Sequence, residues 1–80
     1  MIDLAKPEIR NRIRELRFGR GGMTQQELAI AVGCSRQTIV LLEQNRYSPS
    51  LALALRIAAY FDRRVDDIFE LLEQAPDSGR

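Results

Sequence analysis

Apolar residues recur at spacings of three and four along several short stretches of the chain, which is the pattern of amphipathic helices. One such stretch contains Leu28, Ala29 and Val32, and Thr24-Gln25-Gln26-Glu27 leads into it. In this tetrapeptide the threonine hydroxyl can accept from the N–H of the glutamate, whose side chain can bond back to the threonine N–H, forming a capping box. Gly33 then supplies the left-handed conformation that ends a helix without steric cost. A two-turn helix is predicted between these signals.

A second helix follows after a very short connection. Ser35 suits the N-cap of a helix that runs from Arg36 to about Gln44. Asn45 then tolerates the left-handed conformation that ends a helix better than other non-glycine residues. Only Gly33-Cys34-Ser35 separate the two helices. So short a turn makes them cross steeply, as in the helix-turn-helix motif, whose second helix enters the DNA major groove.

The second helix carries apolar residues on both of its faces. At about 100° per residue, Ile39 and Leu42 point together into the core, with Glu43 beside them. Val40 and Leu41 point the other way. An outward apolar pair either meets thymine methyl groups in a major groove or packs on a neighbouring helix or a second subunit. Because polar side chains early in the helix can discriminate guanine and adenine edges, the predicted base-reading residues are Arg36, Gln37, Val40, Leu41, Thr38 and Gln44.

Three further helices are predicted around this pair. The first begins near Pro7, whose fixed φ suits the first helical position, and its inward residues are Ile9, Ile13 and Leu16. A long apolar helix follows the cap Ser50 and spans Leu51 to Phe61, with Leu51, Leu55, Ala58 and Phe61 predicted to face inward and Leu53, Ile57 and Tyr60 left over. A last helix, near Val65 to Glu73, carries Ile68, Phe69, Leu71 and Leu72. These four residues either form a dimer contact or close the core of the monomer.

Several of these motifs together resemble one known family. They are Thr24-Gln25-Gln26-Glu27-Leu28-Ala29, Gly33, Ser35-Arg36-Gln37-Thr38-Ile39, Glu43 and Tyr47-Ser48-Pro49-Ser50-Leu51. The combination is similar to the phage repressor and Cro superfamily, specifically its Xre-type bacterial branch. The resemblance implies an all-α, five-helix, lambda-repressor-like DNA-binding domain, which is usually a dimer and reads operator bases with its third helix. We expect this domain at residues 8–73, after an N-terminal segment at 1–7 and before a flexible tail at 74–80.

The resemblance also implies roles for residues away from the reading face. Gln25 matches a family position that grips a DNA phosphate, and the N–H groups of a helix N-terminus favour an anion. The predicted phosphate contacts are Thr24, Gln25, Gln26, Asn45, Arg46 and Tyr47. The family further implies a buried ion pair between Arg17 and Glu43, and the inward phase of Glu43 independently requires a cationic partner. The dimer seam in the family is often built at the last helix, here Ile68, Phe69, Leu71 and Leu72.

Composition and charge narrow the possible functions. Eighty residues with 45% hydrophobic content build one core, so we expect no catalytic or effector-binding domain. The net charge is only +1, but residues 6–46 contain eight cationic and four acidic side chains, and residues 47–80 contain four and six. This asymmetry favours a basic DNA face over a generic solvated surface.

The sequence offers little for metal, redox or enzyme chemistry. It contains no His and one cysteine, so we expect neither a zinc site nor an internal disulfide, and no cofactor. Cys34 lies in the inter-helix turn and is interpreted as structural rather than as a redox-sensing thiol. No nucleophile lies beside a base, so an enzyme is not expected. The start Met1-Ile2-Asp3-Leu4 has no signal-peptide pattern and no apolar run approaches the length of a membrane span, which predicts a cytoplasmic protein.

The predicted function is that of a sequence-specific, double-stranded DNA-binding transcriptional regulator, more in keeping with a repressor than an activator. A homodimer would read a pseudo-palindromic operator with half-sites about 34 Å apart. The alternative is an antitoxin or adaptor that binds a partner protein through Val40, Leu41 or the apolar surface of the last helix. A general chromatin-like binder would need a larger cationic surplus and no discriminating side chains.

Overall fold

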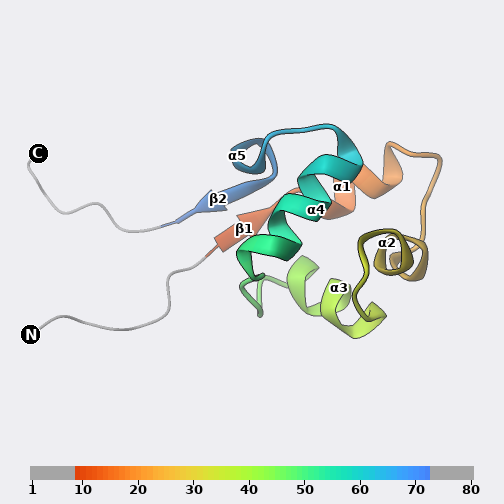
Figure 1. The fold of residues 1–80 in the computed structure, drawn as a ribbon, viewed down its shortest axis with the longest axis horizontal. Coiled ribbons are helices and arrows are strands. Elements are labelled where there is room, and N and C mark those ends of the chain that lie inside the picture. Colours follow the sequence, from red (N-terminus) through yellow and green to blue (C-terminus); the bar gives the residue numbers. More distant parts are fainter. Residues whose placement is uncertain (1–8, 73–80) are drawn as a thin grey trace, which may run out of the picture.

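The computed structural model describes residues 9–72, in which five short helices surround one core and a two-stranded sheet lies at one end (Figure 1). In chain order the elements are β1 (Ile9–Asn11), α1 (Ile13–Phe18), α2 (Gln25–Val32), α3 (Arg36–Glu43), α4 (Leu51–Phe61), α5 (Val65–Ile68) and β2 (Phe69–Leu71). In Figure 1, α3 lies along the lower edge of the molecule, α1 and α5 along the upper edge, and α4 between them. The predicted end segments at residues 1–7 and 74–80, with Pro7, lie outside the described residues. None of the helices within residues 9–72 is long and apolar enough to cross a membrane.

The first element is a strand rather than the start of a helix. β1 and β2 pair antiparallel, with Ile9 opposite Leu71, Arg10 opposite Glu70 and Asn11 opposite Phe69. The prediction that the first helix includes Ile9 is therefore wrong, because residues 9–11 hydrogen-bond to the far end of the chain. The Asn11 side-chain oxygen accepts from the Ile13 N–H at 3.1 Å, and α1 begins at that residue. By accepting from this backbone N–H, the Asn11 side chain favours a turn at residues 11–13 over a helix that would extend further toward the N-terminus.

The last helix is shorter than the sequence predicts. α5 is a single turn that ends at Ile68, and the chain continues directly as β2. The predicted helix is wrong for residues 69–72, while Glu73 lies outside the described residues, and the fold is mainly helical but not all-α. A short apolar run suits either a helix or a strand, and here pairing with β1 decides in favour of the strand. The Arg12 N–H donates to the Ile68 carbonyl at 3.0 Å, which extends the contact between the two ends of the domain.

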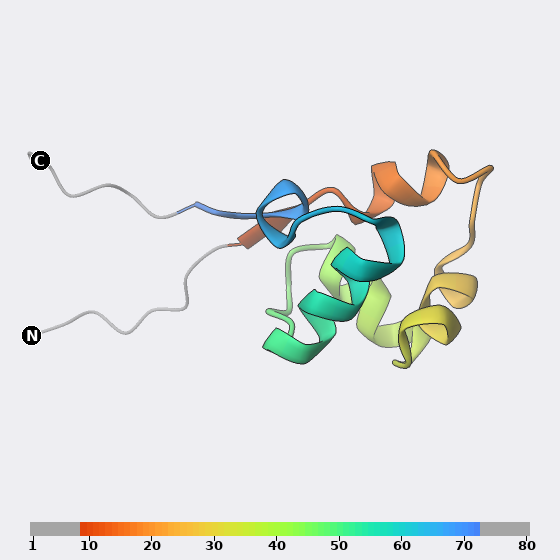
Figure 2. The ribbon, with the colours of Figure 1, turned by 45° about the horizontal axis from the view of Figure 1, so that its top comes forward.

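The two helices with the strongest local signals form as predicted. The Thr24 hydroxyl accepts from the Glu27 N–H at 3.0 Å and the Glu27 carboxylate accepts from the Thr24 N–H at 2.8 Å, which completes the capping box of α2. Gly33 ends α2 with a φ of 80°. Ser35 caps α3 by accepting from the Thr38 N–H at 3.1 Å. Local capping chemistry thus sets the helix–turn–helix geometry that Figure 2 shows from a second direction.

All five helices contribute buried residues to the core, and the inward face of α4 differs from the prediction. The buried apolar residues are Ile13, Leu28, Ala29, Val32, Ile39, Leu42, Leu53, Ala54, Ile57, Ala58, Phe61 and Ile68. Leu51 and Leu55 were predicted to face inward, but they are 73% and 51% exposed. In a helix that is almost wholly apolar, spacing alone leaves the inward face ambiguous. The exposed Arg56 is the polar residue that marks the solvent side of α4.

Two helices end on non-glycine residues in the left-handed conformation. Asn45 after α3 and Asp62 after α4 have φ values of 59° and 57°. After α4, the Asp62 N–H donates to the Ala59 carbonyl and the Arg63 N–H donates to the Ala58 carbonyl, which is the Schellman pattern. The left-handed end predicted at Asn45 is confirmed, whereas that at Asp62 had no counterpart in the sequence prediction.

Glycine in place of Asp62 is expected to stabilise the domain. It removes the steric cost of the left-handed conformation, and we expect the free energy of unfolding to rise by roughly 0.5–1 kcal/mol. That gain corresponds to a few degrees in Tm for a domain of this size. Thermal unfolding followed by circular dichroism measures it. Asp62→Ala is the matched control: because its Cβ keeps the strain, it should not stabilise, and equal Tm values for the two variants would contradict the explanation.

Candidate nucleic-acid interface

The two faces of α3 divide as the sequence predicts. Ile39 and Leu42 are fully buried at 0% exposure. Val40 and Leu41 are half-buried, so each retains a part of its apolar surface for an external contact. The polar residues predicted to read bases are Arg36, Gln37 and Gln44, which are exposed, and Thr38, which is half-buried. α3 thus presents a mixed polar and apolar outer face of the kind that can contact base edges.

The first turn of α3 is fixed by side chains as well as by backbone. Besides its capping bond, the Ser35 hydroxyl lies 2.9 Å from the Thr38 hydroxyl. Thr38 is therefore engaged at the helix start, which makes it less available for base reading than the exposed Arg36 and Gln37. The latter two occupy the helix N-terminus, the part of a recognition helix that contacts bases in helix-turn-helix proteins.

A buried ion pair joins α3 to α1. Arg17 Nε donates to Glu43 Oε2 at 2.6 Å and Arg17 Nη2 donates to Glu43 Oε1 at 3.0 Å, with both side chains 7% exposed. Arg17 Nη1 also donates to the Met23 carbonyl at 2.7 Å, which ties down the connector between α1 and α2. The predicted pair is thus present as a bidentate contact, the geometry that best offsets the cost of burying two charges.

The ion pair continues into the residues predicted to contact DNA. Gln25 Nε2 donates to Glu43 Oε1 at 3.1 Å, and Arg36 Nη2 lies 3.5 Å from Gln25 Oε1. Sequence reasoning placed Gln25 and Arg36 on DNA but missed that Gln25 contacts both Arg36 and Glu43 of the ion pair. One N–H of the Gln25 amide is used internally, and its second N–H and the N-terminal backbone of α2 remain for a phosphate.

Exposed residues flank α3 on both sides. Thr24 and Gln26 are exposed at the start of α2, and Asn45, Arg46 and Tyr47 are exposed in the turn after α3. In that turn the Asn45 N–H donates to the Leu42 carbonyl and the Arg46 N–H donates to the Leu41 carbonyl, both at 2.9 Å. This Schellman pattern fixes the backbone of the turn. The structure therefore brings all the predicted phosphate contacts to the two ends of the helix–turn–helix.

Comparison with known proteins agrees with this geometry. The helix-turn-helix family model matches residues 13–68, from the start of α1 to the end of α5. The chain belongs to the Xre-type helix-turn-helix family. An uncharacterized HTH-type transcriptional regulator of Archaeoglobus fulgidus is 54% identical over 61 residues, which are 76% of this chain and 86% of that protein. YgzD of Bacillus subtilis, likewise an uncharacterized HTH-type transcriptional regulator, is 41% identical over 66 residues, or 82% and 98% of the two chains.

In this Xre-type chain the single cysteine lies at the turn between α2 and α3. Cys34 is half-buried and packs against the core. Burial raises the pKa of the Cys34 thiol, and the nearby Arg56 guanidinium lowers it by less. The cation that acts on this thiol is therefore Arg56 of α4, not the sequence neighbour Arg36. A thiol that stays protonated is a poor nucleophile, which is consistent with a structural role.

The four residues predicted at the dimer seam of this Xre-type chain differ in their surroundings. Ile68 is 2% exposed and belongs to the monomer core. Phe69 and Leu72 are half-buried, and Leu71 is 56% exposed. Beside Phe69 lies an apolar depression, lined by Ile9, Pro49, Leu51, Ala54, Val65 and Phe69. Sequence reasoning did not group these residues, because they come from β1, the α3–α4 loop, α4, α5 and β2.

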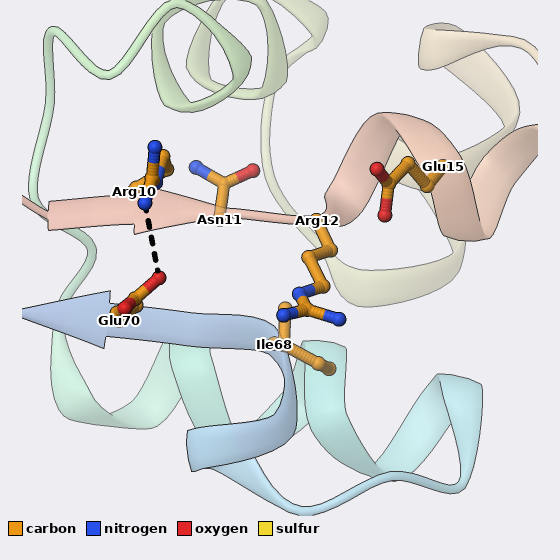
Figure 3. Close-up of a pocket in the computed structure, with 6 residues that line it drawn as sticks. All are labelled: Arg10, Asn11, Arg12, Glu15, Ile68 and Glu70. Atoms are coloured by element: carbon orange, nitrogen blue, oxygen red, sulfur yellow. Dashed lines mark hydrogen bonds and ion pairs between the residues drawn. The ribbon is translucent and has the colours of Figure 1, made fainter.

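A second depression of this family member is polar and lies beside the sheet, at the start of α1 (Figure 3). It is lined by Arg10, Asn11, Arg12, Glu15, Ile68 and Glu70. Arg10 Nη2 and Glu70 Oε1 are 3.4 Å apart and form a cross-strand pair, with both side chains 59% exposed. Exposed pairs of this kind contribute little to stability.

Proposed function

We propose that this chain is a transcriptional regulator that binds double-stranded DNA in a sequence-specific manner, with α3 in the major groove. The outer face of α3 is the observation that carries the proposal. Arg36 and Gln37 are exposed at its N-terminus and can donate to and accept from purine edges, while Val40 and Leu41 offer apolar surface to thymine methyl groups. Thr38 and Gln44 are peripheral candidates for base contacts.

Phosphate contacts on both sides of the groove would set the register of α3. At one end, Gln25 and the backbone N–H groups of α2 favour an anion. At the other end, Arg46 supplies a cation, which forms no ion pair within residues 9–72. Asn45 and Tyr47 supply hydrogen-bond donors. Such contacts position a protein on DNA without selecting sequence.

The proposed assembly is a homodimer. One short helix contacts too few base pairs for a useful specificity ratio, whereas two copies related by a two-fold axis would read half-sites about 34 Å apart. The apolar depression around Leu51 and Phe69 supports a self-association surface, because Leu51 is 73% exposed at its rim. Phe69 lines this depression, and the proposed dimer contact also includes Leu71 at the end of β2 and the next residue, Leu72, with Ile68 in the core behind them.

Repression by occupying the operator fits the surface better than activation. Recruitment of polymerase usually needs an acidic or otherwise adhesive patch close to the bound helix. The Glu43 carboxylate accepts hydrogen bonds from Arg17, and the Glu27 carboxylate accepts from the Thr24 N–H in the capping box of α2. The buried Glu43 carboxylate is not available for a partner, which supports a regulator that acts by blocking access to DNA.

Selection of bound sequences from a random duplex pool at physiological salt tests the proposal. A two-fold-symmetric site should be enriched, and its half-site spacing should match one helical turn of DNA. Absence of any enriched sequence, with weak and salt-sensitive binding only, would overturn sequence-specific regulation. It would favour a protein that acts through a partner bound on the apolar surface near Leu51.

Two substitutions separate base reading from phosphate binding. Gln37→Ala should relax the preference at one operator position and weaken operator binding by roughly 1–3 kcal/mol, because it removes a bidentate base contact. Arg46→Ala should weaken binding to operator and random DNA alike and flatten the dependence on salt. Fluorescence anisotropy on both duplexes at several salt concentrations measures these effects. Equal losses on both duplexes for both variants would contradict the assigned roles.

A further inference from the structure

Asn11 occupies an unusual position between the sheet and the recognition helix. It is the last residue of β1, pairs with Phe69 of β2, and is only half-buried. Its side chain nevertheless makes three hydrogen bonds, one to the start of α1 and two to the end of α3 and the turn after it. Nδ2 donates to the Leu42 carbonyl at 2.7 Å and to Asn45 Oδ1 at 3.4 Å, and Oδ1 accepts from the Ile13 N–H at 3.1 Å.

The two bonds made by Nδ2 reach the C-terminal end of α3. The Leu42 carbonyl also accepts from the Asn45 N–H at 2.9 Å, so it is bound from two sides. The Asn45 amide has its oxygen turned toward Asn11, 3.4 Å from Asn11 Nδ2. The nitrogen of that amide is then left as a donor on an exposed residue.

We propose that Asn11 is a positioning residue for DNA binding. It fixes the turn after α3 and orients the Asn45 amide so that an N–H, not a carbonyl oxygen, meets the DNA phosphate. This inference rests on the proposed function, and it adds a residue from β1 that does not itself contact DNA. It also gives the sheet a role, since pairing with β2 is what places Asn11 against the end of α3.

Asn11→Ser is the variant that isolates this role. The serine hydroxyl can accept from the Ile13 N–H as the asparagine oxygen does, but it is too short to bridge to Leu42 and Asn45. It also adds no charge near DNA. We expect about tenfold weaker binding to operator and to random DNA, as for the loss of one phosphate contact. The slope of affinity against salt should stay unchanged, because no cation is lost.

Two further variants distinguish the proposed positioning role of Asn11 from a general loss of domain stability. Asn45→Gly removes the amide while allowing the left-handed backbone, so Asn11→Ser in that background should weaken binding by far less than tenfold. Ala59→Gly destabilises α4 at an exposed site and should leave DNA affinity unchanged wherever the domain is folded. The proposal would be overturned if the effects of Asn11→Ser and Asn45→Gly on DNA affinity were fully additive. It would also be overturned if Ala59→Gly weakened DNA binding as much as Asn11→Ser does.

Amide hydrogen exchange without DNA provides a readout that does not depend on DNA binding. The Asn45 and Arg46 amides should exchange faster in Asn11→Ser, while that of Ile39 should not. Unchanged exchange at Asn45 and Arg46 would overturn the positioning role. If the natural chain binds no DNA at all, the proposed function fails first; if it binds and Asn11→Ser binds equally well, only the present inference fails.

Discussion

Replacing Arg17 with alanine is expected to lower the free energy of unfolding by about 3–5 kcal/mol, the usual result of leaving one partner of a buried ion pair alone. The Arg17 guanidinium makes three hydrogen bonds, two to Glu43 and one to the Met23 carbonyl. Without it, a carboxylate that is 7% exposed would keep, among residues 9–72, only the Gln25 amide as a partner. Small domains are stable by about 5–15 kcal/mol in total, so this variant should lose much of its folded population. Urea unfolding followed by circular dichroism measures the change.

Arg10→Ala is the matched control for this prediction. It removes the same type of side chain from an ion pair with Glu70, in which both partners are 59% exposed. Surface pairs of this kind contribute less than about 1 kcal/mol. The two variants should therefore differ by several-fold in their loss of stability. Similar small losses for both would show that Glu43 finds other compensation when Arg17 is absent.

If the chain forms the proposed dimer, replacing Leu51 with glutamate is expected to abolish it and to weaken operator binding by about 10²–10⁴-fold. Leu51 is 73% exposed in the single chain, so the substitution should barely change the stability of the monomer. In the proposed dimer, however, each copy would bury a carboxylate in an apolar contact without a partner. Loss of the second DNA-binding copy removes the gain that comes from two linked contacts. Sedimentation equilibrium gives the association state, and anisotropy gives the DNA affinity.

The control for Leu51→Glu is the same substitution one helical turn further along. Leu55 is 51% exposed on α4 but does not line the apolar depression that contains Leu51 and Phe69. Leu55→Glu should remain dimeric and bind the operator normally. A monomeric natural chain, or equal effects of the two variants, would show that self-association does not use the depression.

The helix–turn–helix could be predicted from sequence because its signals are local. The capping box at Thr24, the glycine at 33, the cap at Ser35 and the left-handed Asn45 each act within a few residues. The prediction of the Arg17–Glu43 pair rested on a family resemblance and on the inward position of Glu43 in its helix, and the structure confirms this pair. Base-reading and phosphate-contacting roles stay predictions, since they depend on DNA.

The sheet could not be predicted because its signals are not local. Ile9 and Leu71 are paired although 62 positions separate them, and both lie in apolar patterns that also suit helices. The inward face of α4 was mispredicted for a different reason. Nearly all residues of α4 are apolar, so the helical spacing is compatible with two different inward faces. Arg56 is the one charged residue in this helix, and it gives only a weak indication of which face is exposed. The Gln25–Glu43 contact depends on the packing of α2 on α3, which spacing along one helix does not reveal.

The antiparallel pairing of β1 and β2 also makes this domain suited to circular permutation. Since Ile9 lies opposite Leu71, a short linker can join the two ends of the folded unit without crossing it. New ends can be opened between Gly21 and Gly22, where the space beside each backbone is empty to 4 Å. In the resulting chain α2, α3 and α4 come first, and the two strands are joined as neighbours in sequence. The strand pairing between residues 9–11 and 69–71, which is long-range in the natural chain, would become a local hairpin.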